Sequence, residues 1–322
     1  MDVWHFISRK LNEGIDVELL YVLESQGSSP GRKGFKMAVA ADGTICGTIG
    51  GGIMEHKLVE KAKTMLLQNE RQVLLMRQHH DKEHASDQSG MICSGNQLNA
   101  FMLVSSPDKR TIKEIISATQ TCIRLSPSGI NIIPESPSGL KYNTETDWTY
   151  SEMINQQPVI HIIGGGHVSL ALSELMHFLG FYVKVYDDRR DLNTIATNSF
   201  ADEKHLVNYG DISGQLGNAV NDYVVIMTIG YRTDKIVLRQ LLGCSFYYLG
   251  LLGSSNKIQT LFKELREEGA SQELLGRVNA PIGIDIDSKT TREIAVSIAA
   301  EIIREKNKKL PSGRKRGSNP SP

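Results

Sequence analysis

Apolar and polar positions follow two different periods along the second half of the chain. Four short apolar runs have the length and composition of buried strands: 158–163, 181–187, 222–230 and 245–253. Three further segments carry apolar residues at helical spacing: 167–180, 232–242 and 290–306. Strands that alternate with helices predict a parallel sheet covered on both faces. We therefore expect a Rossmann-like, doubly wound α/β domain over residues 158–306.

The first half mixes the same two patterns in another order. Strand-like apolar runs occur at four places: 17–25, 36–50, 71–77 and 96–104. Asp42 and Gly43 split the second run, and they tolerate the positive φ of a tight hairpin. Residues 52–68 have helical spacing. This combination predicts a mixed α/β domain over residues 1–105.

Residues 106–157 differ from both flanking regions. They contain prolines, Ser-Gly pairs and a polar run, with one short helix predicted at 112–120. We interpret this region as a connector that packs on the domains without forming one. The last segment, 307–322, is basic and rich in Pro, Gly and Ser, so we expect a disordered tail.

Length, composition and charge are those of a globular protein and give no support for nucleic-acid binding or a membrane span. A length of 322 residues suggests about two domains, and 40% hydrophobic residues is an ordinary globular content. The 36 basic and 36 acidic residues cancel, which gives no electrostatic case for nucleic-acid binding. No apolar stretch approaches the roughly 18 residues of a membrane span, and the start does not resemble a secretory signal. The four cysteines are scattered, so we expect reduced thiols in a cytoplasmic protein.

A triple-glycine turn follows the first predicted strand of the second domain. Gly164 permits a tight turn, and Gly165 and Gly166 allow backbone N–H groups to approach a pyrophosphate at a helix N-terminus that begins with His167. Asp187 ends the next predicted strand, where a carboxylate can accept hydrogen bonds from ribose hydroxyls and repel a 2′-phosphate. The pattern predicts a dinucleotide-type site at these five residues.

This glycine pattern leaves two alternatives open. Ser169 stands where the dinucleotide fingerprint has its third glycine, and the turn can be purely structural. An NAD-dependent oxidoreductase would also need an acid or base beside the nicotinamide, and we find no persuasive set. His205 stands alone, and Arg232 can either contact a phosphate or lie at a solvated helix start.

A second triple-glycine turn lies in the first domain. Gly50, Gly51 and Gly52 expose consecutive backbone donors at a predicted helix start, an arrangement suited to an anion. Glu55 lies in the first turn of that helix, and the upstream segment adds the cations Arg32 and Lys33. The alternative is a structural crossover that needs positive φ.

The segment around the first turn, "GSSPGRKGFKMAVAADGTICGTIGGGIMEH", resembles the amino-terminal module of the xanthine dehydrogenase accessory proteins, the XdhC/CoxI family. Four later blocks resemble the Rossmann domain of the same family in the same order: "GGGHVSLAL", "VYDDR", "YLGLLGSSNK" and "APIGIDIDSKTTREIAVSIAAEII". Together these segments run from about residue 24 to residue 303, and only the connector lacks a clear match. The resemblance adds Gly253 and Ser254, from the third of these blocks, to the expected cofactor-binding residues.

The resemblance implies a chaperone in purine catabolism rather than an independent enzyme. Family members bind the molybdenum cofactor, as molybdopterin or its cytosine dinucleotide, while a terminal sulfur is installed. They then pass it to the catalytic subunit of a molybdenum hydroxylase, typically xanthine dehydrogenase. The implied partners are this client protein, a cysteine desulfurase and a second copy in a homodimer. On this basis we expect the cofactor between the two domains, with a separate NAD-like dinucleotide as the other possible ligand.

Cys93 aligns with a Cys-Gly-Gly segment of that family, although Ser94 replaces the first of its glycines. A thiolate suits molybdenum or sulfur in transit, so the resemblance makes Cys93 the candidate metal ligand. The alternative for Cys93 is a small buried side chain without a ligand.

The run at 79–87 has the residue types of a zinc site, with His80 and His84 one helical turn apart, but its polarity equally fits a solvated loop. A last alternative is a non-catalytic scaffold whose glycine turns are structural.

Overall fold

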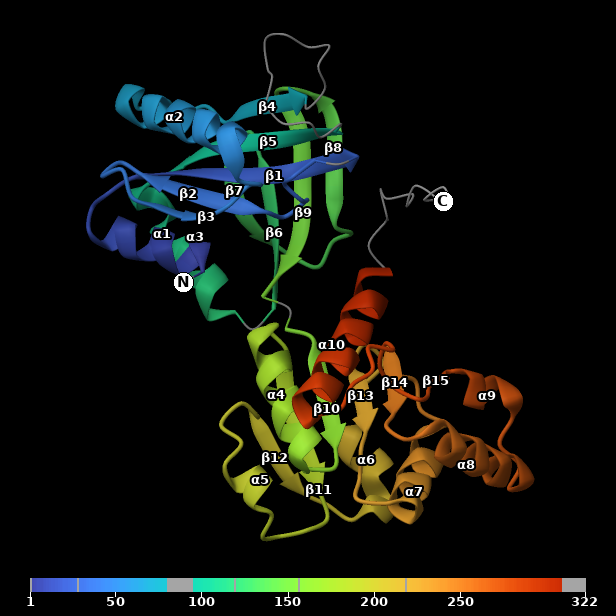
Figure 1. The fold of residues 1–322 in the computed structure, drawn as a ribbon. Helices are drawn as coiled ribbons and strands as arrows, with labels where there is room; N and C mark the ends of the chain where they lie inside the picture. Colours follow the sequence, from blue (N-terminus) through green and yellow to red (C-terminus); the bar gives the residue numbers. More distant parts are fainter. Residues whose placement is uncertain are drawn as a thin grey trace. The chain divides into compact units, whose positions relative to one another are not determined.

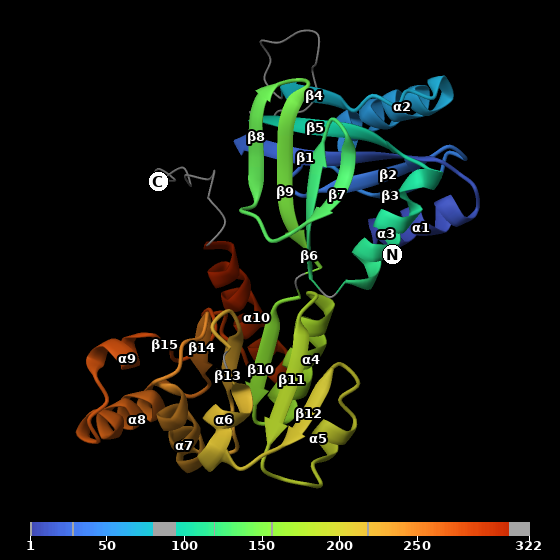
Figure 2. The ribbon, with the colours of Figure 1, turned by 180° about the vertical axis from the view of Figure 1, so that it is seen from behind.

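The computed structural model describes six stretches of the chain: 2–27, 29–79, 95–118, 120–155, 157–217 and 219–308. These residues form two compact units that divide at residue 156, here called the N-terminal and the C-terminal unit. Figures 1 and 2 show the elements of each unit from opposite sides. Within the described residues, no helix combines the length and apolar character needed to cross a bilayer.

The N-terminal unit contains two antiparallel sheets. The first has the order β3-β2-β1-β5-β4 and the second has the order β7-β6-β9-β8. The elements of the first part are α1 Val3–Asn12, β1 Val17–Gly27, β2 Lys36–Ala40, β3 Ile45–Gly47, α2 Gly52–Gln68, β4 Leu74–His79 and β5 Gly95–Val104. The second part adds η1 Ser106–Asp108, α3 Lys109–Ser117, β6 Thr121–Ser126, β7 Gly129–Ile133, β8 Gly139–Thr144 and β9 Asp147–Ile154.

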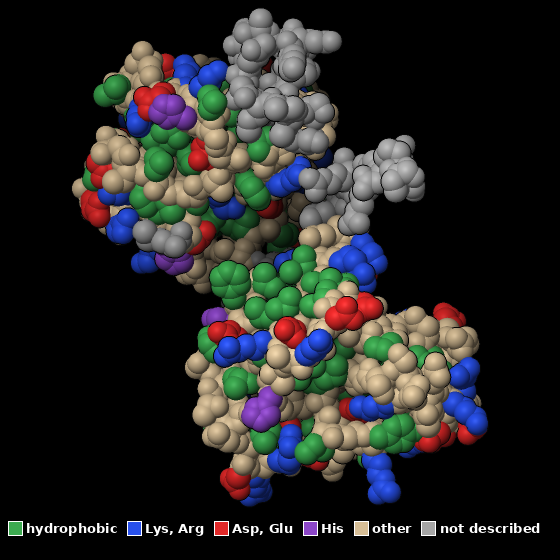
Figure 3. Space-filling view, viewed as in Figure 1, with side chains coloured by type: hydrophobic (Ala, Val, Ile, Leu, Met, Phe, Trp, Pro, Cys, Tyr) green, Lys and Arg blue, Asp and Glu red, His purple; other side chains and the backbone are tan. Residues whose placement is uncertain are grey.

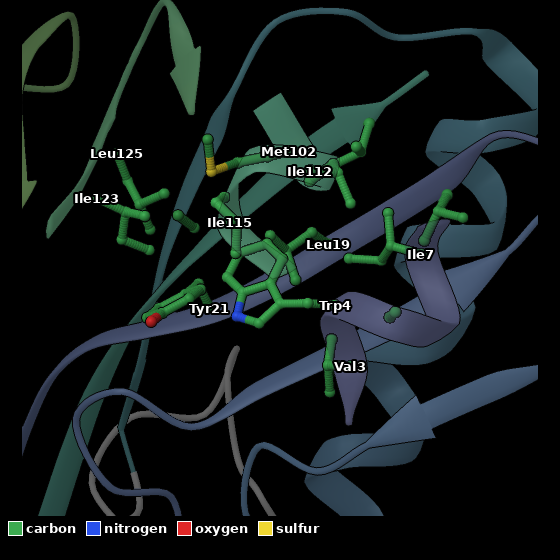
Figure 4. Close-up of a cluster of buried hydrophobic side chains, with 14 of the residues drawn as sticks. Val3, Trp4, Ile7, Leu19, Tyr21, Met102, Ile112, Ile115, Ile123 and Leu125 are labelled. Atoms are coloured by element: carbon green, nitrogen blue, oxygen red, sulfur yellow. The ribbon is translucent and has the colours of Figure 1, made fainter. Parts of the chain in front are cut away.

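Both faces of the first sheet are covered. Alternate residues of a strand point to opposite faces, so β1 supplies Leu20 and Val22 to one core and Leu19 and Tyr21 to the other. Helix α2 covers the first of these faces, and α1, α3 and the second sheet cover the other (Figures 1 and 2). The core under α1 is built around the fully packed Trp4 (Figure 4).

The region expected to be a connector forms a regular sheet, which corrects that interpretation. Its inner face contributes four large side chains to the core beneath the first sheet: Ile123, Leu125, Trp148 and Tyr150. The hydroxyls of Tyr21 and Tyr150 donate to Glu152 Oε2 at 2.8 and 2.7 Å. The strands escaped recognition because they are short and their outer faces are polar or exposed. The helix predicted at 112–120 is present as α3.

The C-terminal unit is built on a six-stranded, fully parallel sheet of order β12-β11-β10-β13-β14-β15. Its elements up to the middle strand are β10 Val159–Ile163, α4 His167–Phe178, β11 Tyr182–Asp187, α5 Asn193–Ala196, β12 Glu203–Leu206, η2 Tyr209–Asp211, α6 Ile212–Leu216 and β13 Tyr223–Ile226. The remainder are α7 Tyr231–Leu241, β14 Tyr248–Leu251, α8 Ser255–Glu267, α9 Gln272–Gly276, β15 Val278–Asn279 and α10 Thr291–Lys308.

Helices cover both faces of this parallel sheet. Helices α4 and α10 pack on one face, and α6, α7 and α8 pack on the other (Figures 1 and 2). The α/β class, the Rossmann-like unit and its parallel sheet are therefore confirmed. Strand β12 and helix α8 had not been predicted. Strand β12 has only four residues at the sheet edge, two of them charged, so its apolar pattern is too short to recognise.

Candidate functional site

The carboxyl edge of the parallel sheet gathers most of the predicted binding residues. The strand order reverses direction between β10 and β13, and the loops after both strands leave the same edge. Ligands of open α/β sheets bind in the crevice outside such a switch point. The turn at Gly164–Gly166 follows β10, Asp187 ends β11, and Gly253 and Ser254 follow β14, so one edge carries them all.

The three glycines of this turn meet different surroundings. Gly164 has φ +110°, and a Cβ there would overlap the Met227 carbonyl and lie 2.9 Å from the Cα of Thr228. A Cβ on Gly165 would overlap the side chain of Ile195. At Gly166 a Cβ would meet nothing within 4 Å. The first two glycines are therefore required by the protein's own packing, and Gly166 alone borders open space.

Asp187 is fully buried and already has protein partners. The Gly165 N–H donates to its Oδ2 at 2.7 Å, and the Arg189 side chain donates to both carboxylate oxygens at 2.8 Å. Burial opposes ionisation, but the hydrogen bonds from Arg189 and Gly165 outweigh it and hold the pKa of Asp187 below its ordinary value. Binding of a ribose hydroxyl to Asp187 stays a prediction. Such a hydroxyl would have to compete with the Arg189 guanidinium for the carboxylate oxygens.

The first turn of α4 offers backbone N–H groups as further hydrogen-bond donors. Gly166 is the N-cap, and no side chain caps the helix there. The amides that open a helix have no acceptor in the preceding turn, and the helix dipole makes that end attractive to anions. Ser169 fits at the third fingerprint position: it is 1% exposed, and its hydroxyl has no hydrogen-bond partner among the described residues. The open side of Gly166 leaves the amides from His167 onward as candidate donors, and an anion bound to them stays a prediction.

A buried ion pair braces the neighbouring loops. Asp234 is fully buried and accepts from the Thr228 backbone N–H at 3.0 Å and from the Lys257 ammonium. Lys257 also donates to the Leu252 carbonyl at 3.2 Å, so it ties the loop after β14 to the loop after β13. Sequence reasoning missed Asp234 and Lys257. No sequence signal marked the pairing, because it joins two helix starts that are distant along the chain.

The predicted residues Gly253 and Ser254 immediately precede helix α8. The Ser254 hydroxyl accepts from the Lys257 N–H at 3.4 Å and acts as the helix cap. A Cβ on Gly253 would lie 3.0 Å from the Lys257 side chain. Both residues therefore have local structural partners at the same edge as the glycine turn, and their contact with a cofactor stays a prediction.

The first glycine turn is closed by its own helix. Glu55 Oε2 accepts from the N–H groups of Ile49 and Gly51, each at 2.9 Å, and from the Thr48 hydroxyl at 2.6 Å. Gly50, Gly51 and Gly52 all have positive φ, between 71° and 134°. Of the three donors that we expected an anion to occupy, the Gly51 N–H is held by Glu55 and the Gly50 N–H donates to the Thr48 hydroxyl at 3.2 Å. These contacts favour the structural alternative for Gly50 and Gly51.

A row of buried amides lies beneath this first turn. The Gln97 side chain donates to the Ile49 carbonyl at 3.2 Å and to Asn99 Oδ1 at 2.9 Å, and it accepts from the Ser29 hydroxyl at 2.8 Å. Buried amides are stable only when hydrogen-bonded, so this row fixes the backbone of the turn from below. Lys33, expected as a cation of the site, instead lies 5.4 Å from the centre of the Tyr150 ring.

Several expected residues fall outside the described stretches. Cys93, the candidate metal ligand, is one of them, and so are His80 and His84 of the alternative zinc site. Across the described stretches, no group of three or more His, Cys, Asp or Glu side chains is arranged to hold a metal ion. The basic tail beyond residue 308 also lies outside the description.

Two family descriptions match the chain in the order expected from the sequence. "XdhC and CoxI family" matches residues 11–77, and "XdhC Rossmann domain" matches residues 160–302. The chain belongs to the XdhC and CoxI family. The family resemblance inferred from the sequence is thereby confirmed.

Individual relatives are distant. The chain is 28% identical to the uncharacterized protein YqeB of Escherichia coli K12, over 89% of this chain and 43% of the relative. It is 25% identical to a Bacillus subtilis protein named as a probable xanthine dehydrogenase subunit, over 52% and 49%. It is 20% identical to the molybdenum cofactor insertion chaperone PaoD of E. coli K12, over 93% and 86%. The chain thus spans less than half the length of the first two relatives.

One solved structure covers nearly the whole chain. A crystal structure described as a xanthine dehydrogenase from Bacillus halodurans aligns with a TM-score of 0.72 over 98% of both chains, at 22% identity. At this identity the similarity demonstrates a shared fold, which agrees with the arrangement of sheets described above.

Proposed function

We propose that this chain is an accessory protein that binds the molybdenum cofactor and delivers it to the catalytic subunit of xanthine dehydrogenase or a related molybdenum hydroxylase. Membership of the XdhC and CoxI family supports this, as do relatives named as a molybdenum cofactor insertion chaperone and a xanthine dehydrogenase subunit. The observation that carries the proposal is the uncapped start of α4 beside the open side of Gly166. The proposal extends to purine metabolism, a cytoplasmic location, a homodimer and a cysteine desulfurase partner, all implied by the family resemblance.

The residues of the C-terminal unit fit the phosphate end of that cofactor. Molybdopterin carries a phosphate and its dinucleotide form a pyrophosphate, and helix-start amides bind either group without a basic patch. Positively and negatively charged side chains are interspersed on the face of this unit seen in Figure 3, which agrees with recognition by amides. The cofactor supplies the redox chemistry of the client enzyme, whereas this chain's part is to bind, shield and release it.

A second candidate function is an NAD-dependent oxidoreductase. The switch point of the parallel sheet favours it, because dinucleotides bind at such places. Hydride transfer also needs a proton donor or acceptor beside the ligand, and His161 of β10 does not supply one. His161 is 3% exposed and lies between the Tyr186 hydroxyl and Asp222 Oδ2, each at 2.9 Å, which leaves neither ring nitrogen for a substrate. If a dinucleotide binds at this switch point, we therefore expect binding without hydride transfer.

A co-elution experiment tests the first proposal. Purified protein is incubated with cofactor released anaerobically from a molybdoenzyme, then gel-filtered, with molybdenum and pterin fluorescence measured in the protein fraction. We expect both to co-elute, and an excess of inorganic pyrophosphate to reduce the bound fraction. If neither molybdenum nor pterin accompanies the protein, the carrier role is refuted. Thermal protection by NAD together with substrate turnover would instead establish the second candidate.

A further inference from the structure

An exposed hydrophobic residue stands beside the second glycine turn. Ile229, in the short loop between β13 and α7, is 76% exposed. Other exposed hydrophobic residues of this unit lie away from the switch point. Phe178, Ile236 and Val296 are on the helices α4, α7 and α10, and hydrophobic side chains gather over α4 and α10 in Figure 3. Leu206 ends β12 and Ile286 follows β15, the two outer strands of the sheet. Val220 precedes β13 and is therefore at the opposite edge of the sheet. Ile229 is thus a large apolar side chain placed at the switch point.

The loop that carries Ile229 is held rigidly on both sides. Before it, Thr228 donates its N–H and its hydroxyl to Asp234 Oδ1, at 3.0 and 2.6 Å. After it, the Gly230 carbonyl accepts from the Thr233 hydroxyl at 2.9 Å and from the Asp234 N–H at 3.0 Å. Asp234 is itself fully buried and paired with Lys257. The exposure of Ile229 is therefore imposed by the loop rather than being the result of a loose segment.

This loop packs directly against the glycine turn. A Cβ on Gly164 would lie 2.9 Å from the Thr228 Cα, and the Met227 N–H donates to the Ile163 carbonyl at 2.8 Å. Ile229 is the residue after Thr228, so its Cα lies about 3.8 Å from the Thr228 Cα that approaches the turn. The backbone of Ile229 therefore lies beside the turn that leads into α4, at the edge where an anion bound to the first amides of that helix would lie.

We infer that Ile229 is a binding residue that packs against the planar heteroaromatic ring of a phosphorylated ligand at this edge. The inference rests on the proposed function, because it assumes that the phosphate lies at the start of α4. Ligand sites combine a few placed polar groups with apolar walls, and the polar groups at this edge include the amides that open α4, the Ser254 hydroxyl and the Asp187–Arg189 pair. A rigid branched side chain adds apolar contact with a ring at little conformational cost.

Calorimetric titrations with two probes test this inference. Cytidine 5′-diphosphate carries a ring and inorganic pyrophosphate does not. We expect Ile229→Ala to weaken binding of the nucleotide about tenfold, equivalent to about 1.4 kcal/mol, with pyrophosphate affinity unchanged within about twofold. Ile229→Leu should retain most of the nucleotide affinity. Val220→Ala, which trims an exposed branched residue at the opposite edge, should change neither probe.

The outcomes separate the two proposals. If wild-type protein binds pyrophosphate as tightly as the nucleotide, or if Ile229→Ala binds the nucleotide normally, the ring contact is refuted and the phosphate site stands. If wild-type protein binds neither probe, the phosphate site and the ring contact both fail. If Ile229→Ala binds both probes normally but no longer activates a client hydroxylase, Ile229 is a contact for the client rather than for a ligand.

Discussion

Replacing Gly166 by aspartate should strengthen the fold while blocking the proposed phosphate site. Gly166 has φ −73° and ψ −171°, an extended conformation that any residue adopts, and its Cβ position is open. Aspartate is among the preferred N-cap residues because its carboxylate accepts from the amides two or three positions into the helix. Here those amides belong to Val168 and Ser169. The new side chain would therefore occupy the donors that we assign to a phosphate.

The expected magnitudes have opposite signs. An aspartate cap gains a few tenths of a kcal/mol over glycine, and its charge at the helix N-terminus adds about 0.3–1 kcal/mol. In a unit of this size, 1 kcal/mol shifts Tm by about 2–4 °C, so we expect an increase of about 1–5 °C. A phosphate would lose hydrogen bonds worth about 1.5–3 kcal/mol each and would meet a like charge, so its affinity should fall more than about tenfold.

The assay pairs thermal unfolding with pyrophosphate titration for wild type, Gly166→Asp and Gly166→Ala. Alanine supplies a Cβ but no acceptor, so it controls for steric effects and should bind pyrophosphate within about threefold of wild type. A Gly166→Asp protein that binds pyrophosphate like wild type would refute the anion site at α4. A lower Tm for Gly166→Asp would refute the open geometry of the turn on which the argument depends.

Three further predictions concern buried or capping groups. The Glu18 carboxyl has no hydrogen-bond partner among the described residues, and burial, together with the nearby Glu70 charge, raises its pKa from 4.5 to about 8. The folded state therefore holds more protons than the unfolded state between these values, and stability should fall as pH rises, by up to about 1.4 kcal/mol per unit. Glu18→Gln should flatten this slope in urea unfolding at pH 5.5, 7 and 8.5, and equal slopes would contradict it. Ser169→Ala removes a buried hydroxyl without a described partner, so urea unfolding should show unchanged stability or a gain of up to about 1 kcal/mol; a loss above that would reveal a missed bond. Glu55→Ala should destabilise the N-terminal unit by about 2–4 kcal/mol, with Glu55→Gln intermediate, because three donors lose their acceptor; an unchanged Tm would count against the cap.

The local elements at the candidate site could be predicted from the sequence. An apolar run followed by glycines and a helical pattern specifies a strand, a tight turn and a helix, because each feature depends on residues close together in the chain. Gly164 occupies the positive φ expected for the tight turn. The hairpin around Asp42 and Gly43 is present for the same reason.

The partners of the carboxylates could not be predicted in the same way. Asp187 was expected to face a ligand, but Arg189, two residues further on, folds back onto it. Whether such a pair forms depends on burial and on the path of the loop, which no local pattern records. Glu55 is similar, because its hydrogen bonds to the turn depend on where that turn meets α2.

The second sheet of the N-terminal unit illustrates another limit. Its strands have few consecutive apolar residues, and its attachment depends on Glu152 accepting from Tyr21, a residue far away in the chain. Pairings between distant residues of this kind are invisible to a window of ten or fifteen residues. The proline and glycine content of 106–157 marks the turns between strands rather than an irregular connector.

The pairing of α10 with α4 on one sheet face has a consequence for biosynthesis. Helix α10 is the last element of the chain that the structure describes, yet its Ala295, Ile298 and Ile302 complete the hydrophobic layer over β10 and α4. A nascent chain that has emerged only as far as β15 would leave this layer open to water. The hydrophobic layer over α4 is therefore complete only after residues 291–302 have left the ribosome, long after α4 itself has been translated.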